Sequence, residues 1–177
     1  MDLEAQAAAL KAAIRDVPDF PKAGIVFKDI TTLLRDPVLL RRTIDLLAVL
    51  VGDLAVERVL AIESRGFILG GALAPRLGAG FVPARKPGKL PWKTVRASYE
   101  LEYGRDSIEM HEDGLTKGDR VLIVDDVIAT GGTARAASEL VREAGATVSA
   151  FVFLVELSFL GGRDKLGGHD VRALIRY

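Results

Sequence analysis

The sequence of 177 residues contains no cysteine, which excludes disulfides, thiolate catalysis and cysteine-based metal sites. Its 24 basic residues are balanced by 24 acidic ones, so the net charge offers no general attraction to nucleic acid or to an anionic membrane. No apolar run is long enough to span a bilayer, and residues 1–16 lack the basic start and apolar core of a signal peptide. We therefore expect a cytoplasmic protein with neither nucleic acid nor membrane as partner, in which any anion site is local.

The apolar pattern predicts an α/β fold in a single domain. About half of the residues are hydrophobic, enough for one domain of this length to bury a sizeable core. Four short apolar runs without polar alternation are typical of strands buried on both faces of a parallel sheet. They lie at 59–62, 81–84, 121–124 and 148–155, with helices expected at 37–51, 67–77 and 134–144 and a closing edge strand at 171–175. The alternation predicts a central, mostly parallel sheet flanked by helices.

The stretch from Val121 to Thr133 reads V-L-I-V-D-D-V-I-A-T-G-G-T. Asp125 and Asp126 end a buried strand, where open α/β sheets bind their ligands. The small or hydroxylated residues before the next helix offer backbone N–H groups, hydroxyls and a favourable helix dipole to a phosphate. They are Ala129, Thr130, Gly131, Gly132 and Thr133. No lysine follows the glycines and G-x-G-x-x-G is absent, which excludes the Walker loop and the dinucleotide fingerprint. An ordinary βαβ turn is the alternative interpretation.

Two further segments carry basic residues near predicted strand ends. Arg65 follows the strand at 59–62 and is a candidate anion ligand, the alternative being a surface arginine paired with Glu63. Between residues 85 and 96 the chain has five basic residues and no acidic one, namely Arg85, Lys86, Lys89, Lys93 and Arg96. A solvated loop is the default interpretation of such a run. Pyrophosphate or polyphosphate is the most economical partner, because a few converging cations neutralise it.

The remaining segments predict a cap and an arm. Residues 19–34 mix prolines with Ile25, Val26 and Phe27, which indicates a partly buried segment that caps another part of the molecule. Runs at 99–103 and 107–111 alternate polar and apolar residues around a glycine-containing turn at 104–106, as in a β-hairpin that could act as a lid. Its acids, Glu100, Glu102 and Glu109, are interpreted as its solvent-facing side unless one of them faces a substrate.

Six segments together resemble one family. V-L-I-V-D-D-V-I-A-T-G-G-T resembles the phosphoribosyl pyrophosphate motif of type I phosphoribosyltransferases. D-F-P-K-A-G-I-V-F-K-D-I, E-S-R-G-F, R-K-P-G-K-L-P, Y-E-L-E-Y-G-R-D and V-E-L resemble, in the same order, segments of the adenine phosphoribosyltransferase family. The likeness covers nearly the whole chain, and departs from the pattern at Ala23 and Thr32, where proline is common. It implies a type I phosphoribosyltransferase fold with an N-terminal hood at about residues 17–34 and a flexible arm at about 95–112.

The resemblance implies transfer of the 5-phosphoribosyl group of phosphoribosyl pyrophosphate to adenine, giving AMP and pyrophosphate. It also implies a homodimer, and Mg²⁺ carried by the substrate near Asp125 and Asp126. The loop Ala129–Thr133 would hold the 5′-phosphate, and the two aspartates the ribose hydroxyls. Pyrophosphate would be bound by Arg65, Arg85, Lys86 and Lys89, one or more of them reaching from a partner subunit.

The same resemblance implies an adenine site and a catalytic arm. Val26, Phe27 and Lys28 would form a hood over adenine, Phe27 by stacking and the others through backbone groups, with Leu157 on the opposite face. Glu102 and Tyr103 would lie on the arm and, with Arg65, form the catalytic set. We hypothesise that Glu102 assists proton transfer at the purine ring.

Two alternatives remain. An enzyme of the same fold acting on xanthine, hypoxanthine or orotate would keep the phosphate loop but change the base contacts; the hood and Leu157 argue against it. A non-catalytic regulator that senses phosphoribosyl pyrophosphate would keep the loop, but we would expect it to carry a nucleic-acid-binding module or a strongly basic face.

Overall fold

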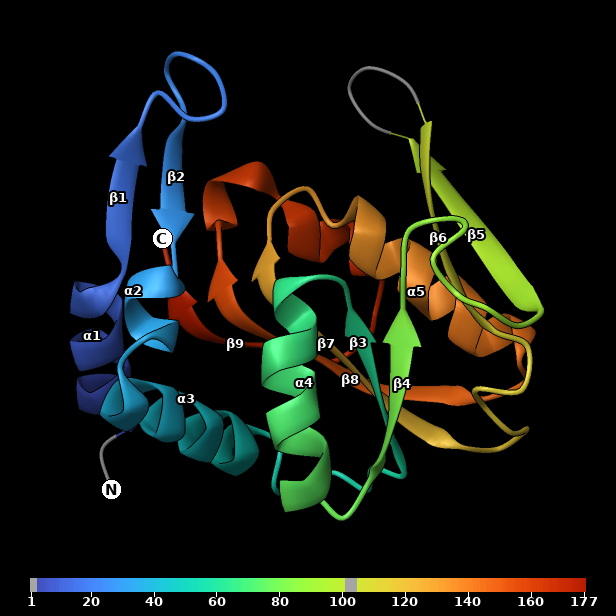
Figure 1. The fold of residues 1–177 in the computed structure, drawn as a ribbon. Helices are drawn as coiled ribbons and strands as arrows, with labels where there is room; N and C mark the ends of the chain where they lie inside the picture. The colour runs from blue at the N-terminus through green and yellow to red at the C-terminus, as the bar shows by residue number, and fades with distance from the viewer. Residues whose placement is uncertain (1–2, 101–104) are drawn as a thin grey trace.

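The central element of the computed structural model, which describes residues 3–100 and 105–177, is a parallel five-stranded sheet (Figure 1). Its strands lie in the order β4-β3-β7-β8-β9. They are β3 (Arg58–Ile62), β4 (Gly80–Ala84), β7 (Arg120–Ile128), β8 (Thr147–Glu156) and β9 (Val171–Arg176). All four pairings between neighbours are parallel. The prediction of an α/β fold around a mostly parallel sheet is confirmed, including β9 as an edge strand.

The helices cover both faces of this sheet. They are α1 (Leu3–Ala13), α2 (Thr31–Leu34), α3 (Pro37–Leu50), α4 (Arg65–Arg76) and α5 (Gly132–Glu143). Asp36 caps α3, because its carboxylate accepts hydrogen bonds from the N–H groups of Val38 (2.8 Å) and Leu39 (3.0 Å). In α4, Gly70 packs on β3, where an added Cβ would lie 2.6 Å from that of Ala61. The close approach of helix and strand therefore depends on this glycine.

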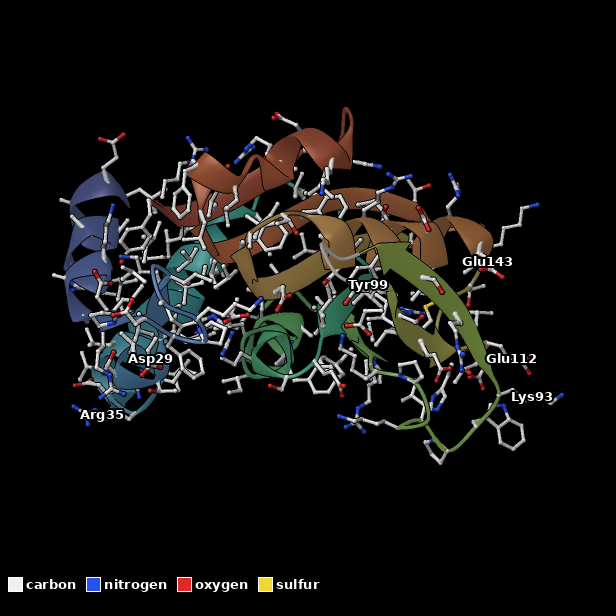
Figure 2. All side chains as sticks on the ribbon, turned by 90° about the horizontal axis from the view of Figure 1, so that it is seen from above. Asp29, Arg35, Lys93, Tyr99, Glu112 and Glu143 are labelled. Carbon is white, nitrogen blue, oxygen red and sulfur yellow. The ribbon has the colours of Figure 1, made fainter. Side chains whose placement is uncertain are left out.

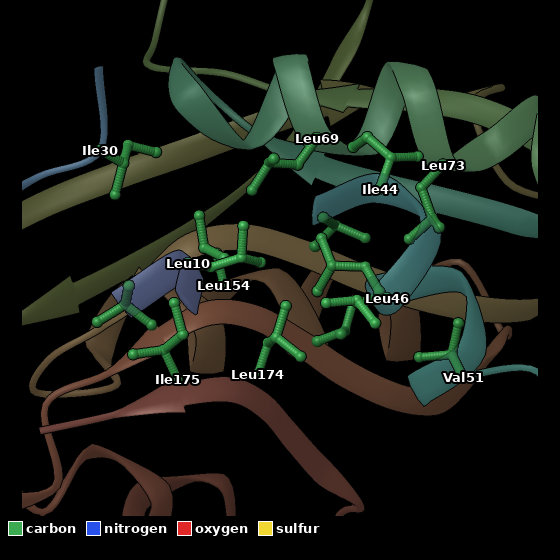
Figure 3. Close-up of a cluster of buried hydrophobic side chains, with 14 of the residues drawn as sticks. Leu10, Ile30, Ile44, Leu46, Val51, Leu69, Leu73, Leu154, Leu174 and Ile175 are labelled. Atoms are coloured by element: carbon green, nitrogen blue, oxygen red, sulfur yellow. The ribbon is translucent and has the colours of Figure 1, made fainter. Parts of the chain in front are cut away.

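The core forms two layers, because successive side chains of a strand point to opposite faces. Leu122 and Val124 of β7 pack with α1, α3 and α4, in the cluster shown in Figure 3. Val121 and Ile123 pack on the other side, with α5 and the hairpin described below. The whole run is buried, as expected for a strand covered on both sides.

Two antiparallel strand pairs stand on either side of the upper edge of the sheet in Figure 1. They are β1 (Arg15–Pro18) with β2 (Val26–Asp29), and β5 (Thr94–Glu100) with β6 (Arg105–His111). The second pair confirms the predicted hairpin, but its predicted turn is wrong, because Asp106 already pairs with Tyr99 inside the ladder. The strand also begins earlier than expected. Val95, Ala97 and Tyr99 alternate with polar residues, so the strand pattern already starts within the segment interpreted as a basic loop.

Two short 3₁₀ turns, η1 (Ser158–Leu160) and η2 (Gly162–Leu166), join β8 to the last strand, β9. In the described parts of the chain, no helix has the length and apolar character needed to cross a membrane.

Candidate functional site

A cavity of about 520 Å³ opens at the carboxyl ends of β3, β7 and β8. Its wall comes from both strand pairs as well as from the sheet: β2 contributes one side, and Tyr99 and Ile108 of the hairpin another. Figure 2, seen from above, shows Tyr99 on the hairpin beside the sheet. Parallel strands that end together bring residues distant in sequence to one place. Residues 25–28, 62–65, 125–127, 129 and 157 meet there.

The two adjacent aspartates lie at the centre of the cavity. Asp126 is 5% exposed and forms an ion pair with Arg65, the first residue of α4. Helix α4 begins against the end of β7 because residue 66 is glycine: an added Cβ there would lie 3.0 Å from both Asp125 Oδ1 and the carbonyl oxygen of Val124. Arg65 is thus paired with Asp126, and the alternative interpretation of a surface arginine paired with Glu63 is wrong.

Asp125 is held in an unfavourable environment for a carboxylate. Burial raises its pKa well above the usual value, and the negative charge of Asp126 raises it further, against the hydrogen bond from the Asp126 N–H and the charge of Arg65. The N–H of Asp126 donates to Asp125 Oδ1 at 2.8 Å. A group that binds to Asp125 through hydroxyls or a cation would relieve this cost.

The predicted phosphate loop lines a smaller hollow of about 90 Å³ formed by residues 127–134. Gly131 has φ of +78° and precedes the first residue of α5. The N–H groups in the first turn of a helix have no intrahelical acceptor, so they are available to an anion. All five predicted residues, Ala129–Thr133, line this hollow, and Ala129 and Thr133 also line the large cavity.

A contact that the sequence did not predict supports this loop from behind. Gly162 of η2 lies so close that an added Cβ would be 2.2 Å from the carbonyl oxygen of Ala129. An added Cβ on Gly131 would in turn lie 2.3 Å from the carbonyl oxygen of Gly162. The two backbones therefore touch without room for a side chain. The only signal in the sequence is the frequency of glycine between residues 161 and 168.

The predicted pyrophosphate ligands divide into two groups. Lys86 lines the cavity together with Arg65, whereas Arg85 and Lys89 reach the cavity-lining residue Glu63. Arg85 Nε donates to Glu63 Oε2 at 2.8 Å, and Lys89 Nζ lies 3.2 Å from Glu63 Oε1. The N–H of Lys86 donates to Glu63 as well, at 2.9 Å. Glu63 thus organises three of the four predicted cations.

Sequence reasoning missed this role of Glu63, whose side chain is only 8% exposed. Burial raises the pKa of Glu63, but the hydrogen bonds from the Lys86 N–H and from Arg85 and Lys89 outweigh it, so its pKa lies below the usual value. The signal available was its position directly after β3 and two residues before Arg65. Glu63 holds the basic loop in place while it stays ionised.

Lys86 is also bound to the hairpin. Its Nζ lies 3.1 Å from the Tyr99 hydroxyl and forms an ion pair with Asp106. Burial lowers the pKa of Lys86, but the hydrogen bonds to Asp106 and Tyr99 outweigh it, so its pKa is raised. Lys86 is therefore a cation in the cavity wall, and the hairpin and the basic loop are joined there.

The interpretation of Glu109 as a solvent-facing acid is wrong. Glu109 is 3% exposed and accepts hydrogen bonds from Arg96 Nε at 2.8 Å and from the N–H of Gly88 at 3.1 Å. Its backbone pairs with Arg85 as an isolated bridge. The alternating pattern of β6 predicts that its polar side chains share one face of the strand. It does not show that the basic loop covers this face at Glu109. Arg96, predicted to belong to that loop, instead lies on β5 and neutralises Glu109.

The predicted hood residues and Leu157 do lie on one cavity. Phe27 contacts Phe20 edge-to-face at 5.3 Å between ring centroids, and the Arg65 guanidinium lies 5.4 Å from the Phe27 ring. The amine of Lys28 is directed elsewhere, 2.7 Å from Asp16 Oδ1. Val26, Phe27 and Lys28 therefore line one cavity together with Leu157.

Two predicted catalytic residues, Glu102 and Tyr103, lie outside the described residues, and their roles stay predictions. Within residues 3–100 and 105–177, no group of three His, Cys, Asp or Glu side chains could hold a metal ion. Asp125 and Asp126 are the carboxylates that the cavity offers beside the phosphate loop. Such a pair suits Mg²⁺ only if other oxygens complete its ligand set, because Mg²⁺ in proteins is commonly held by one or two carboxylates plus substrate phosphates.

Comparisons with known proteins give consistent results. A family model described as "Phosphoribosyl transferase domain" matches residues 30–165. The chain is 55% identical over 168 residues to an adenine phosphoribosyltransferase of Thermotoga neapolitana, covering 95% of this chain and 99% of that relative. The adenine phosphoribosyltransferase structure from Thermoanaerobacter pseudethanolicus has a TM-score of 0.95 and 50% identity, covering 97% of this chain and 99% of that one.

A second similar structure contains bound molecules. It is the adenine phosphoribosyltransferase of Saccharomyces cerevisiae complexed with D-2,5-dideoxy-2,5-imino-altritol 1,6-bisphosphate and adenine. Its TM-score is 0.90 at 42% identity, covering 96% of this chain and 98% of that one.

Proposed function

This chain belongs to the adenine phosphoribosyltransferases, and we propose that the cavity at the carboxyl ends of β3, β7 and β8 is the site where it forms AMP and pyrophosphate. The family is shown by the matched domain and by relatives above 50% identity over nearly the whole chain, and the predicted type I phosphoribosyltransferase fold is confirmed. The chain is thus a pentosyltransferase of purine salvage. One observation carries the placement of the site: a single cavity joins the aspartates, the loop at 129–133, Lys86 and the β2 wall.

We propose that the ribose of phosphoribosyl pyrophosphate lies over Asp125 and Asp126, with its 5′-phosphate in the loop Ala129–Thr133. Helix α5 begins at that loop and directs its free N–H groups and dipole toward an anion. The ribose hydroxyls would donate hydrogen bonds to carboxylates, of which Asp125 is the one whose ionised form is least stabilised by the protein. Hydrogen bonds from the bound ribose would stabilise the ionised form of Asp125, which its surroundings in the protein disfavour.

We propose that pyrophosphate leaves toward Arg65 and Lys86, with Arg85 and Lys89 behind them. Displacement at C1′ develops positive charge on the ribose and negative charge on the departing group, so cations placed beforehand stabilise the transition state. Arg85 and Lys89 are held by Glu63 and need not be reorganised for the reaction. Mg²⁺, which the two aspartates fit in combination with substrate phosphates, would neutralise part of the charge on the leaving group.

We propose that adenine lies between Phe27 and Leu157. Both side chains line the cavity, and a purine has the flat apolar faces that such a pair encloses. The Lys28 amine is turned toward Asp16, which leaves the backbone of β2 to hydrogen-bond the edge of the base. Backbone donors and acceptors at fixed positions provide the recognition by which one purine is distinguished from another.

The decisive experiment is a steady-state assay of pyrophosphate release with phosphoribosyl pyrophosphate, Mg²⁺ and adenine, hypoxanthine, xanthine or orotate in turn. We expect turnover with adenine well above that with the other bases. An equal or higher rate with another base would contradict the adenine site, and no release with any base would favour the non-catalytic regulator.

The role of Glu102 as the group that assists proton transfer at the purine remains a proposal with its own test. Glu102→Gln should lower turnover with adenine and flatten its pH profile, because the variant side chain cannot exchange a proton. Unchanged turnover across pH would show that Glu102 has another role. Tyr103, its neighbour in the sequence, is proposed to act on the same arm.

The predicted cytoplasmic location stays a prediction. We also propose that the chain acts as a homodimer. Support for the dimer comes from exposed apolar side chains on the edge strand β4 and on helix α4, which packs against it, namely Phe81 at 41% and Ile68 at 45%. Exposed apolar side chains gathered beside an unpaired sheet edge are typical of an interaction surface.

A further inference from the structure

Tyr177, directly after β9, is bonded to both sides of Leu157. Its N–H donates to the carbonyl oxygen of Glu156 at 3.0 Å, and its own carbonyl oxygen accepts from the N–H of Ser158 at 3.0 Å. These are the residues immediately before and after Leu157. The backbone of Tyr177 therefore fixes the position from which Leu157 faces the cavity.

The ring of Tyr177 contacts the opposite wall. The Lys28 amine lies 4.1 Å from the ring centroid and the Lys11 amine 4.2 Å from it. An ammonium over an aromatic face is attracted by the ring quadrupole, more strongly when it is shielded from water. Lys28 is largely buried and is also paired with Asp16 of β1. The ring is therefore attached to α1 through Lys11 and to the β1–β2 pair through Lys28. Figure 1 places residue 177, marked C, beside β2.

The β1–β2 pair needs such an attachment. Its two strands form a separate sheet and pair only with each other, and a two-stranded sheet is marginally stable by itself. Toward its tip, Phe20 and Ile25 are about half exposed. The angle at which β2 stands over the cavity therefore depends on contacts near its base, where Tyr177 lies.

We propose that Tyr177 is a positioning residue for the purine base, which sets the distance between the β2 wall and Leu157. Tyr177 does not itself line the cavity, so it acts through Lys28 on one side and through the backbone around Leu157 on the other. The inference rests on the base site proposed above. It predicts that Tyr177 affects binding of adenine and not binding of phosphoribosyl pyrophosphate, whose proposed contacts lie on β7, the phosphate loop, Arg65 of α4 and the basic loop.

The test compares Tyr177→Leu with Tyr177→Phe in the full chain. Leucine keeps an apolar side chain of similar bulk but has no ring face, whereas phenylalanine keeps the ring and loses only the hydroxyl. We expect Tyr177→Leu to raise KM for adenine about fivefold or more, the scale of two lost cation–ring contacts. KM for phosphoribosyl pyrophosphate should stay within about twofold, and Tyr177→Phe should resemble the wild type in both constants. Thermal unfolding of each variant verifies that it is folded.

A second substitution tests the route of the effect. Lys11→Met removes one of the two cations without touching the cavity, and should raise KM for adenine by part of the Tyr177→Leu effect. Both changes remove the contact between Lys11 and the ring, and Lys11→Met also removes a hydrogen bond to the Arg176 carbonyl oxygen. The effect of the double variant should therefore be smaller than the product of the two single effects. Fully multiplicative effects would contradict the proposed contact.

Phe27→Ala separates failure of the inference from failure of the base site. If Phe27→Ala raises KM for adenine and Tyr177→Leu does not, the inference is wrong and the base site stands. If neither variant changes it, the base does not bind at β2 and both are wrong. An equal rise in KM for both substrates with Tyr177→Leu would show a general structural role and would also overturn the inference.

Discussion

At the scale of single residues, the carboxylates of Asp125 and Glu63 have opposite roles because their surroundings differ. Asp125 is partly buried beside a second carboxylate, so its pKa is raised, whereas Glu63 receives hydrogen bonds from three neighbours and its pKa is lowered. The first is destabilised in its ionised form and suited to receive a ligand. The second is stabilised in its ionised form and suited to hold cations in place.

Asp125→Asn should stabilise the protein while impairing substrate binding. A folded-state pKa above the unfolded value means that the folded chain binds more protons, so this group costs stability as pH rises through its raised pKa. At neutral pH the variant should be more stable by about 1 kcal/mol, or about 2–4 °C in Tm, with a higher KM for phosphoribosyl pyrophosphate. Thermal unfolding from acid to neutral pH, with the exposed Asp113→Asn as control, measures it. A difference in Tm that does not grow with pH would contradict the assignment.

Glu63→Gln should loosen the basic loop. Loss of a buried charged acceptor costs about 1–3 kcal/mol, and KM for phosphoribosyl pyrophosphate should rise more than KM for adenine. The lowered pKa means that the stabilisation by Glu63 is present above its usual pKa and is lost as pH falls through the folded value. Glu57→Gln is the matched control, because Glu57 pairs with Arg120 at an exposed site and should matter little. Equal effects of the two variants in kinetics and unfolding would refute the role of Glu63.

At the scale of elements, the site depends on backbones that touch. The phosphate loop rests on η2 through Gly131 and Gly162, and the hairpin is joined to the basic loop through Glu109 and Lys86. Neither contact joins residues that are near in sequence. Each gives a loop that binds an anion a fixed support, so little ordering is required when substrate arrives.

Gly162→Ala should displace the phosphate loop. A Cβ at residue 162 would overlap the Ala129 carbonyl oxygen, and overpacking of this kind costs about 1–3 kcal/mol. We expect a lower Tm and a raised KM for phosphoribosyl pyrophosphate, with KM for adenine less affected. Gly71→Ala is the control, since nothing lies within 4 Å of a Cβ there and alanine favours the interior of a helix by about 1 kcal/mol. If Gly162→Ala behaves like Gly71→Ala, the loop does not depend on this contact.

At the scale of the whole molecule, the sheet has two edges that differ in cover. Helix α1 lies along β9, with Leu10 buried in the same core as Leu174 and Ile175 (Figure 3). At the other edge, β4 carries the exposed Phe81. An uncovered apolar edge is normally protected by a partner, which is the basis of the proposed dimer.

Phe81→Glu should therefore convert a dimer to a monomer without unfolding it. Sedimentation velocity measures the mass, and thermal unfolding checks the fold. Val49→Glu is the control, because Val49 is also exposed, at 64%, but lies on α3, and this variant should remain a dimer. A monomeric wild type would refute the dimer, and a dimeric Phe81→Glu would place its interface elsewhere.

Much of the fold could be predicted because its signals are local. The run Val121–Val124 is apolar at every position, so it indicates a strand covered on both faces, and Asp36 before Pro37 marks the start of a helix. The hairpin was found by its alternation, but its turn was misplaced. Arg105 and Asp106 beside Gly104 look like turn residues, and the register that assigns them to β6 is decided by pairing across the hairpin.

The sequence by itself determined the strands of the central sheet, most helices and the residue types of the site, because hydrophobic periodicity, capping and the order of motifs are properties of neighbours along the chain. Only the tertiary structure decided the partners: Arg65 with Asp126, Glu63 with the basic loop, Glu109 under that loop, Gly162 behind the phosphate loop, and Tyr177 between two lysines. Each of these contacts joins residues that lie far apart in the sequence and meet only in the folded chain. Their geometry follows from packing, which no local pattern encodes.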